Sequence, residues 1–172
     1  MTGFLVLEDG AVFRGESVGT PGSAFGEAVF TTAMTGYQEV VTDPSYADQI
    51  VCFTAAMVGN YGVATTHSES ARAHARAVVM REARGPAWTD WLHDRGLVAL
   101  SGIDTRSLVL HLRQAGSMRA IAMAGEASLE EALEEAQQAT RNYAKRQLTW
   151  FRNQTPDWPR LSGPDDEVPI GS

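Results

Sequence analysis

Two kinds of residue in this sequence have the chemistry to act on another molecule, and the first is a thiol. Cys52 is the only cysteine in the 172 residues, so an internal disulfide is excluded. Covalent catalysis by a thiol requires an exposed thiolate, a nearby base and donors for an oxyanion. Cys52 instead stands in a continuous apolar run, residues 50–53, which is typical of a strand buried on both faces. We therefore predict that it is a small core residue rather than a nucleophile.

The second kind is a row of basic residues near the end of the sequence. Its members are four, four and three residues apart, which would place them on one face of a helix. They are Arg141, Lys145, Thr149 and Arg152, with Arg146 and Trp150 in the adjacent row. A cationic strip beside an aromatic ring can contact phosphates and stack on a base. The alternative is a basic helix end that complements its own dipole and the acidic residues at 130–135.

The stretch from residue 30 to residue 63 contains the backbone signals around which the other elements are arranged. Pro44 fixes its own φ angle and keeps Asp43 out of the helical region. Residues 59–62, Gly-Asn-Tyr-Gly, form a loop that would let the backbone approach another surface closely. A pair of ordinary turns explains the same residues equally well.

Composition narrows the possible functions. The net charge is −7, which argues against a surface that binds nucleic acid generally. No run of eighteen apolar residues is present, and the first residues lack a basic and apolar signal pattern, so we predict a cytoplasmic protein. We predict neither a metal site nor a cofactor.

Periodicity and turn residues predict strands alternating with helices. Residues 4–7 and 11–14 form a hairpin around Asp9-Gly10, and residues 15–26 are mostly loop. Helices are expected at 89–95, with Thr89 as N-cap and Gly96 as the stop, and from Asp104 to residue 115, ended by Gly116. The remaining expected strands are residues 27–32, 50–53, 77–80, 97–100 and 118–123.

A different kind of segment begins at Ser128. Ser128 and Glu131 form a capping box, and apolar residues then keep helical spacing with no Gly or Pro before Pro156. We predict a long amphipathic helix over residues 128–154 and a disordered tail over 155–172. The domain organisation is thus a folded unit at 1–127, the helix, and the tail.

Several long motifs in the first three quarters resemble a known family. LVLEDGAVFRGESVG, FGEAVFTTAMTGYQEVVTDPSYADQIVCFT, VGNYGV and SGIDTRSLVLHLRQAGSMRA look like the small chain of glutamine-dependent carbamoyl phosphate synthase over about residues 4–133. The resemblance implies an α/β fold, with a mixed and mostly antiparallel β/β/α domain that packs on the synthase large chain. It also implies that Ser45, the serine of DPSY, reaches the glutamine site. The plain alternative is that Ser45 only caps the turn after Pro44.

The sequence departs from that family in one important respect. In the family, a glutamine amidotransferase domain with a Cys-His-Glu site follows, and ammonia passes to the large chain for carbamoyl phosphate synthesis in the arginine and pyrimidine pathways. This sequence stops long before that domain and offers no candidate nucleophile, so no catalytic residue is predicted. We expect no glutaminase activity from this chain alone.

The last quarter resembles a second family. Residues 139–161, ATRNYAKRQLTWFRNQTPDWPRL, are similar to the C-terminal helix of bacterial tRNA dimethylallyltransferase. The resemblance implies contacts with tRNA through the basic row. The phosphate-binding loop that such a transferase needs is absent, so isopentenyl transfer is not expected.

Three functions are compatible with these observations. The chain is a truncated or chimeric small-chain domain that docks on a large chain, a tRNA-binding fragment, or a folded chimera without activity. A homodimer through the apolar face of the long helix is a further expectation, because an isolated helix seldom stays folded in water.

Overall fold

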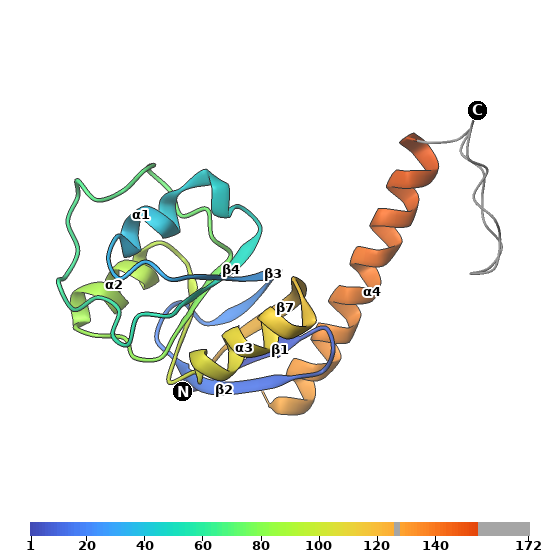
Figure 1. Cartoon of the computed structure of the whole chain (residues 1–172), viewed down its shortest axis with the longest axis horizontal. Helices are drawn as coiled ribbons and strands as arrows, with labels where there is room; N and C mark the ends of the chain where they lie inside the picture. The colour runs from blue at the N-terminus through green and yellow to red at the C-terminus, as the bar shows by residue number, and fades with distance from the viewer. Residues whose placement is uncertain (126–127, 155–172) are drawn as a thin grey trace. The chain divides into compact units, whose positions relative to one another are not determined.

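The computed structural model describes residues 1–125 and 128–154 and divides the chain into two compact units, Met1–Thr140 and Arg141–Ser172. The tail predicted to be disordered, residues 155–172, lies outside the described residues. Figure 1 shows the elements of the first unit, in which three strands come first and short helices are then interspersed among the other strands. The fold is the mixed α/β architecture expected from the sequence.

Seven strands of the described residues pair into a closed ring in the order β1-β2-β6-β5-β4-β3-β7. Four of the pairings are antiparallel and three are parallel, namely β3 with β4, β4 with β5, and β5 with β6. The strands are β1 (Thr2–Leu7), β2 (Val12–Ser17), β3 (Gly22–Thr31), β4 (Gln49–Phe53), β5 (Ala77–Met80), β6 (Val98–Ser101) and β7 (Met118–Ala124).

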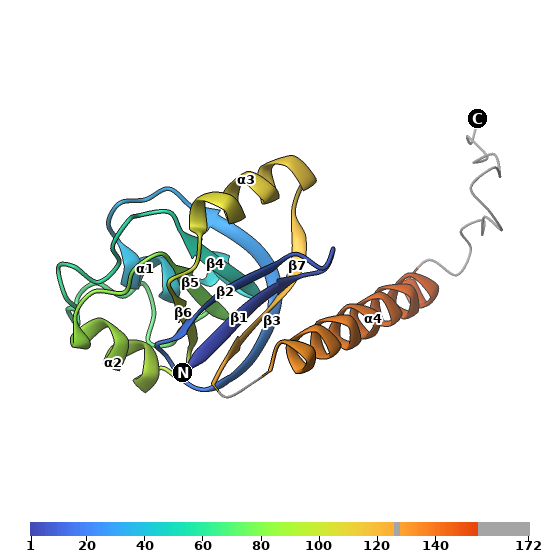
Figure 2. The ribbon, with the colours of Figure 1, turned by 90° about the horizontal axis from the view of Figure 1, so that it is seen from below.

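The helices of the described residues follow β3, β5, β6 and β7 along the chain (Figure 2). The sequence predicted α3 and α4 almost to the residue. The helical elements are α1 (Tyr37–Thr42), the 3-10 turn η1 (Pro44–Tyr46), α2 (Pro86–Asp94), α3 (Thr105–Ala115) and α4 (Leu129–Gln154).

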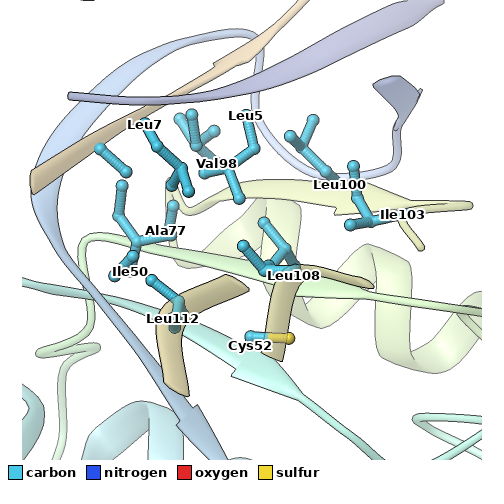
Figure 3. Close-up of a cluster of buried hydrophobic side chains, with 14 of the residues drawn as sticks. Leu5, Leu7, Ile50, Cys52, Ala77, Val98, Leu100, Ile103, Leu108 and Leu112 are labelled. Atoms are coloured by element: carbon cyan, nitrogen blue, oxygen red, sulfur yellow. The ribbon is translucent and has the colours of Figure 1, made fainter. Parts of the chain in front are cut away.

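Alternate residues of the central strands enter different clusters, as the continuous apolar runs predicted. Ile50 and Cys52 point into the ring and pack with Leu108 and Leu112 of α3 (Figure 3). Val51 and Phe53, which point the other way, belong to a second cluster that α1 and α2 cover. The parallel strands β4 and β5 are therefore buried on both faces.

A third cluster lies on the outer face of β1 and β7. Phe4, Val6, Ile121 and Met123 contact Ala132 and Ala136, which are 0% and 7% exposed, with Leu133 packed alongside. The first turns of α4 therefore cover this face within the first unit. The capping box predicted at Ser128 is formed, because the Ser128 N–H donates to Glu131 Oε2 at 2.7 Å and the Glu131 N–H to Ser128 Oγ at 3.2 Å.

The prediction of a loop over residues 15–26 was wrong, because strands occupy both ends of this segment and two of its glycines serve close packing. Gly15 lies in β2, and Gly26 lies in β3, which begins at Gly22. A Cβ on Gly26 would lie 2.6 Å from the carbonyl oxygen of Asp48, and one on Gly15 would lie 2.4 Å from that of Ser101. The glycines allow neighbouring backbones to approach each other in the ring.

The predicted start of α2 was also wrong. The helix begins at Pro86, whose missing N–H and fixed φ angle suit the first helical position. Thr89 lies inside the helix, where its hydroxyl donates to the Pro86 carbonyl at 3.0 Å, so it is not the N-cap. Gly96 does end the helix with a φ of 65°, as predicted.

Candidate functional site

Ser45 lies in an exposed turn that its own neighbours hold rigid. Asp43 is the N-cap of η1, and its Oδ1 accepts the Ser45 N–H at 2.8 Å and also the Ser45 hydroxyl. Pro44 supplies the first residue of the turn. Asp43 rather than Ser45 therefore caps the turn, and Ser45 lies within the turn, exposed to solvent.

The hydrogen bonds in this turn determine what the Ser45 hydroxyl can offer to a ligand. The hydroxyl of Ser45, followed by its N–H, lowers the pKa of the Asp43 carboxyl, so Asp43 is a carboxylate at neutral pH. Because the hydroxyl hydrogen points to that carboxylate, the oxygen lone pairs remain to accept a hydrogen bond. The turn thus suits a ligand group that donates, such as an ammonium or an amide N–H.

A buried tyrosine joins this region to the Gly-Asn-Tyr-Gly loop. The Tyr37 hydroxyl lies 2.9 Å from the Met34 carbonyl, 3.1 Å from the Met57 carbonyl and 3.3 Å from Asn60 Oδ1. The ring of Tyr61 stacks on that of Tyr37, with 4.9 Å between centroids. The loop after β4 and the start of α1 are therefore one packed structure.

The sequence prediction that the loop's glycines allow close approach fits Gly59, which has a φ of 91°. A Cβ there would lie 2.5 Å from both the Arg84 carbonyl oxygen and the Cβ of Trp88. The surface that the loop approaches thus belongs to this chain. A shallow pocket of about 570 Å³ lies beside it, lined by Met57, Gly59, Asn60, Arg84 and Gly85.

Cys52 occupies the position expected of a core residue. It is 1% exposed on β4, and burial raises the pKa of its thiol to about 12. A thiol with that pKa is protonated at neutral pH and cannot serve as a nucleophile.

The basic row lies on the last turns of α4. Arg141, Lys145 and Thr149 are exposed, and the Thr149 hydroxyl donates to the Lys145 carbonyl at 2.9 Å. In the adjacent row Arg146 is exposed and Trp150 is 54% exposed. The side chain of Arg152 lies outside the described residues. This row belongs to the second unit, whereas Ser45 belongs to the first.

Sequence reasoning missed the buried residues of α1, the helix that precedes the Ser45 turn in the chain. It predicted no helix at 37–42, yet α1 buries Tyr37, Gln38, Val41 and Thr42. The available signal was their spacing, because residues 37, 38, 41 and 42 recur at i, i+1, i+4 and i+5 on one helical face. Two of the four are polar, which hides the pattern from a search for apolar periodicity.

No helix among residues 1–125 and 128–154 is both long and apolar enough to cross a membrane.

Comparison with known proteins identifies the family. The family described as carbamoyl-phosphate synthase small chain, CPSase domain, matches residues 5–122. The carbamoyl phosphate synthase small chain of Xanthomonas campestris pv. campestris is 49% identical over 140 residues, which cover 77% of this chain and 37% of that protein. The small chain of Maridesulfovibrio salexigens is 43% identical over 146 residues, covering 80% and 39%. The chain thus spans somewhat more than a third of the length of these relatives.

Among solved structures, an aminopeptidase from Aneurinibacillus sp. strain AM-1 aligns with a TM-score of 0.47 and 17% identity, covering 72% of this chain and 30% of that one. A likeness at that level carries no argument about fold or function. The family match, by contrast, covers β1 to β7, so that the chain belongs to the carbamoyl-phosphate synthase small-chain family, in its CPSase domain.

Proposed function

We propose that this chain is the part of a carbamoyl phosphate synthase small chain that docks on the synthase large chain, in carbamoyl phosphate synthesis for the arginine and pyrimidine pathways. The observation that carries the proposal is the family match over residues 5–122, which runs from within β1 to within β7. A domain with its own buried core can present a preformed surface to a partner, so little ordering cost accompanies binding.

Binding to a large chain tests this function directly. The purified chain is titrated into the large chain of a related synthase in a calorimeter, and we expect a one-to-one complex at micromolar concentration. A related full-length small chain should displace it from the complex, which shows that both use the same surface. Leu100→Asp places a charge in the ring interior and should disrupt the fold. It should not bind, which would show that binding requires the folded domain. No heat and no co-elution at micromolar concentration would refute the docking function.

Within this function, we propose that Ser45 meets the glutamine substrate as a hydrogen-bond acceptor. The support is its exposure and the Asp43 carboxylate that takes up its hydroxyl hydrogen. The test is Ser45→Ala, placed in a small chain that contains the rest of the family's length, with Ser23→Ala as the matched exposed control. We expect KM for glutamine to rise for Ser45→Ala alone, and an unchanged KM would remove Ser45 from the site.

A second candidate function is tRNA binding by α4, and the exposed basic row favours it. The chain is acidic overall, so a local strip of Arg141, Lys145 and Arg146 is the feature that could contact phosphates. Lys145→Ala with Arg146→Ala should weaken tRNA binding and reduce its salt dependence. Arg106→Ala with Arg113→Ala removes two exposed charges from α3 and serves as the matched control. Equal binding by both double variants would eliminate this function.

We also propose that any homodimer uses the second half of α4. Ala132 and Ala136 of the first half are already buried against β1 and β7, whereas Leu148 is 57% exposed. Sedimentation of Leu148→Glu, compared with the unaltered chain, tests the dimer. The variant should sediment as a monomer where the unaltered chain is dimeric.

A further inference from the structure

A long segment without helix or strand, residues 59–75, wraps α1, and we call it the strap. At the start of α1 the Tyr61 hydroxyl accepts the N–H groups of Gly36 at 2.7 Å and Tyr37 at 3.2 Å. The helix has no side-chain cap of its own there. One residue further on, the Gln38 side chain donates to the Ala64 carbonyl at 3.1 Å and accepts the Ala64 N–H at 2.7 Å. The strap thus provides hydrogen-bond partners for the N–H groups and the Gln38 side chain at the first turn of α1.

The last residue of α1 is held in the same way. Thr42 is 0% exposed, and its Oγ1 accepts the Glu69 N–H at 2.9 Å while donating to the Gln38 carbonyl at 2.6 Å. The Ser70 hydroxyl donates to the Thr42 carbonyl at 2.7 Å. The hydroxyl and the carbonyl of Thr42 are therefore both hydrogen-bonded to the strap.

Such support is necessary because α1 is only six residues long. A helix of that length cannot maintain itself in water, since the cost of its first turn exceeds what its few internal hydrogen bonds return. The orientation of α1 is thus set by the strap and by the core beneath it. Asp43 follows Thr42 directly, so the orientation of α1 sets the position of Asp43. Asp43 in turn sets the position of Ser45, because its carboxylate accepts the Ser45 N–H at 2.8 Å.

We propose that Thr42 is a positioning residue, which ties the end of α1 to the strap and thereby fixes the direction in which the Asp43-Pro44-Ser45 turn presents the Ser45 hydroxyl. The benefit of that direction to a substrate rests on the proposed role of Ser45 at the glutamine site. The positioning itself does not, because it concerns contacts within this chain alone.

The pKa of Asp43 reports on the turn, because the Ser45 hydroxyl and N–H lower it. The nearby titratable group is His74, whose charge also lowers the pKa of Asp43. The Asp43 carboxyl is therefore titrated by carbon NMR. The variant is Thr42→Val, which keeps the shape of the side chain and removes its hydroxyl.

We expect the Asp43 pKa in Thr42→Val to rise toward 3.8, the ordinary value of an aspartate. The Glu69 amide should exchange about five to ten times faster, because it loses its acceptor. Thr42→Ser, which restores the hydroxyl, should return both quantities to those of the unaltered chain. Thr105→Val, at another buried threonine, should change neither.

The proposal is overturned if Thr42→Val folds and leaves the Asp43 titration and the Ser45 amide signal unchanged. If Thr42→Val does not fold, Ser70→Ala provides the same test from the strap side, because it removes the donor to the Thr42 carbonyl. An unaltered Asp43 titration in Ser70→Ala would then overturn it. A failure of the chain to bind a large chain would refute the proposed function but would not affect these signals.

Discussion

At the scale of single residues, the contrast between Cys52 and Ser45 shows what kind of chemistry this domain can support. Cys52 has a reactive atom but no access to solvent, and the raised pKa keeps its thiol protonated. Ser45 has access, but its hydroxyl hydrogen is directed to Asp43, so it is suited to accept a hydrogen bond. The two residues together are suited to noncovalent contact with a ligand rather than to covalent catalysis.

The burial of Cys52 predicts how the thiol reacts with a disulfide reagent. In the native chain, labelling should proceed only as fast as the protein opens, because the thiol is buried and protonated. Adding urea should accelerate it steeply as the unfolded fraction grows. The control is Ser45→Cys, whose new thiol is exposed and should react at once in the native state. Rapid labelling of Cys52 itself in native buffer would contradict the buried position.

At the scale of elements, the sequence predicted those parts whose signals are local. The ends of α3 follow from Asp104, whose Oδ1 accepts the Ser107 N–H at 3.0 Å, and from Gly116, which has a φ of 91°. The start of β3 could not be predicted in this way. Gly22 and Gly26 usually mark loops. Only the closed ring, in which Gly22 pairs with Ala124 and the backbone of Asp48 approaches Gly26, shows that they belong in a strand.

The same reasoning explains why α1 and the support of the Ser45 turn were missed. The helix is defined by hydrogen bonds to the strap, from residues up to 28 positions away, as between Ser70 and Thr42. Contacts at such separations add nothing to a short window of sequence, and the spacing within α1 is hidden from a search for apolar periodicity because two of its four buried residues are polar. A family motif identified Ser45 as a functional candidate. The residues that hold Ser45 in place were identified only in the structure.

The close approach at Gly26 predicts a strongly destabilising substitution. Gly26→Ala would place a Cβ 2.6 Å from the Asp48 carbonyl oxygen, at the junction of β3 and β4. Because both atoms belong to backbone, relief requires the strands to separate, and we expect a loss of about 1–3 kcal/mol in the free energy of unfolding. Urea denaturation measures it. An unchanged midpoint would mean that the ring tolerates a local separation of these strands.

The cap of α3 predicts a stability that depends on pH. The Ser107 N–H is the main cause of a lowered Asp104 pKa, so the carboxylate stabilises the folded state above the ordinary aspartate pKa and loses this effect as the pH falls through the folded value. Asp104→Ala should lower Tm by a few degrees at pH 7 and progressively less below pH 4. Asp90→Ala, which removes an exposed carboxylate from inside α2, is the matched control. An equal loss at pH 7 and pH 3 would refute the role of the charge.

At the scale of the whole molecule, the burial of the first turns of α4 shows how far the synthase-like domain extends along the chain. The family match ends at residue 122, within β7, yet Ala132 and Ala136 are buried against β1 and β7. The first half of α4 therefore belongs physically to the synthase-like domain. The second half, from Arg141, forms a unit of its own and holds the basic row. A functional boundary, where one exists, is thus expected near Thr140 rather than at residue 127.

That boundary predicts different outcomes for two truncations. A chain ended after Thr140 keeps Ala132, Leu133 and Ala136 on the outer face of β1 and β7, and it should unfold at the same temperature as the complete chain. A chain ended after Gly125 exposes that face, and we expect it to lose about 2 kcal/mol of stability and to bind a hydrophobic dye. Calorimetry and dye fluorescence measure both effects. If the longer truncate were also destabilised, residues beyond Thr140 would contribute to the core, and the proposed boundary would be refuted.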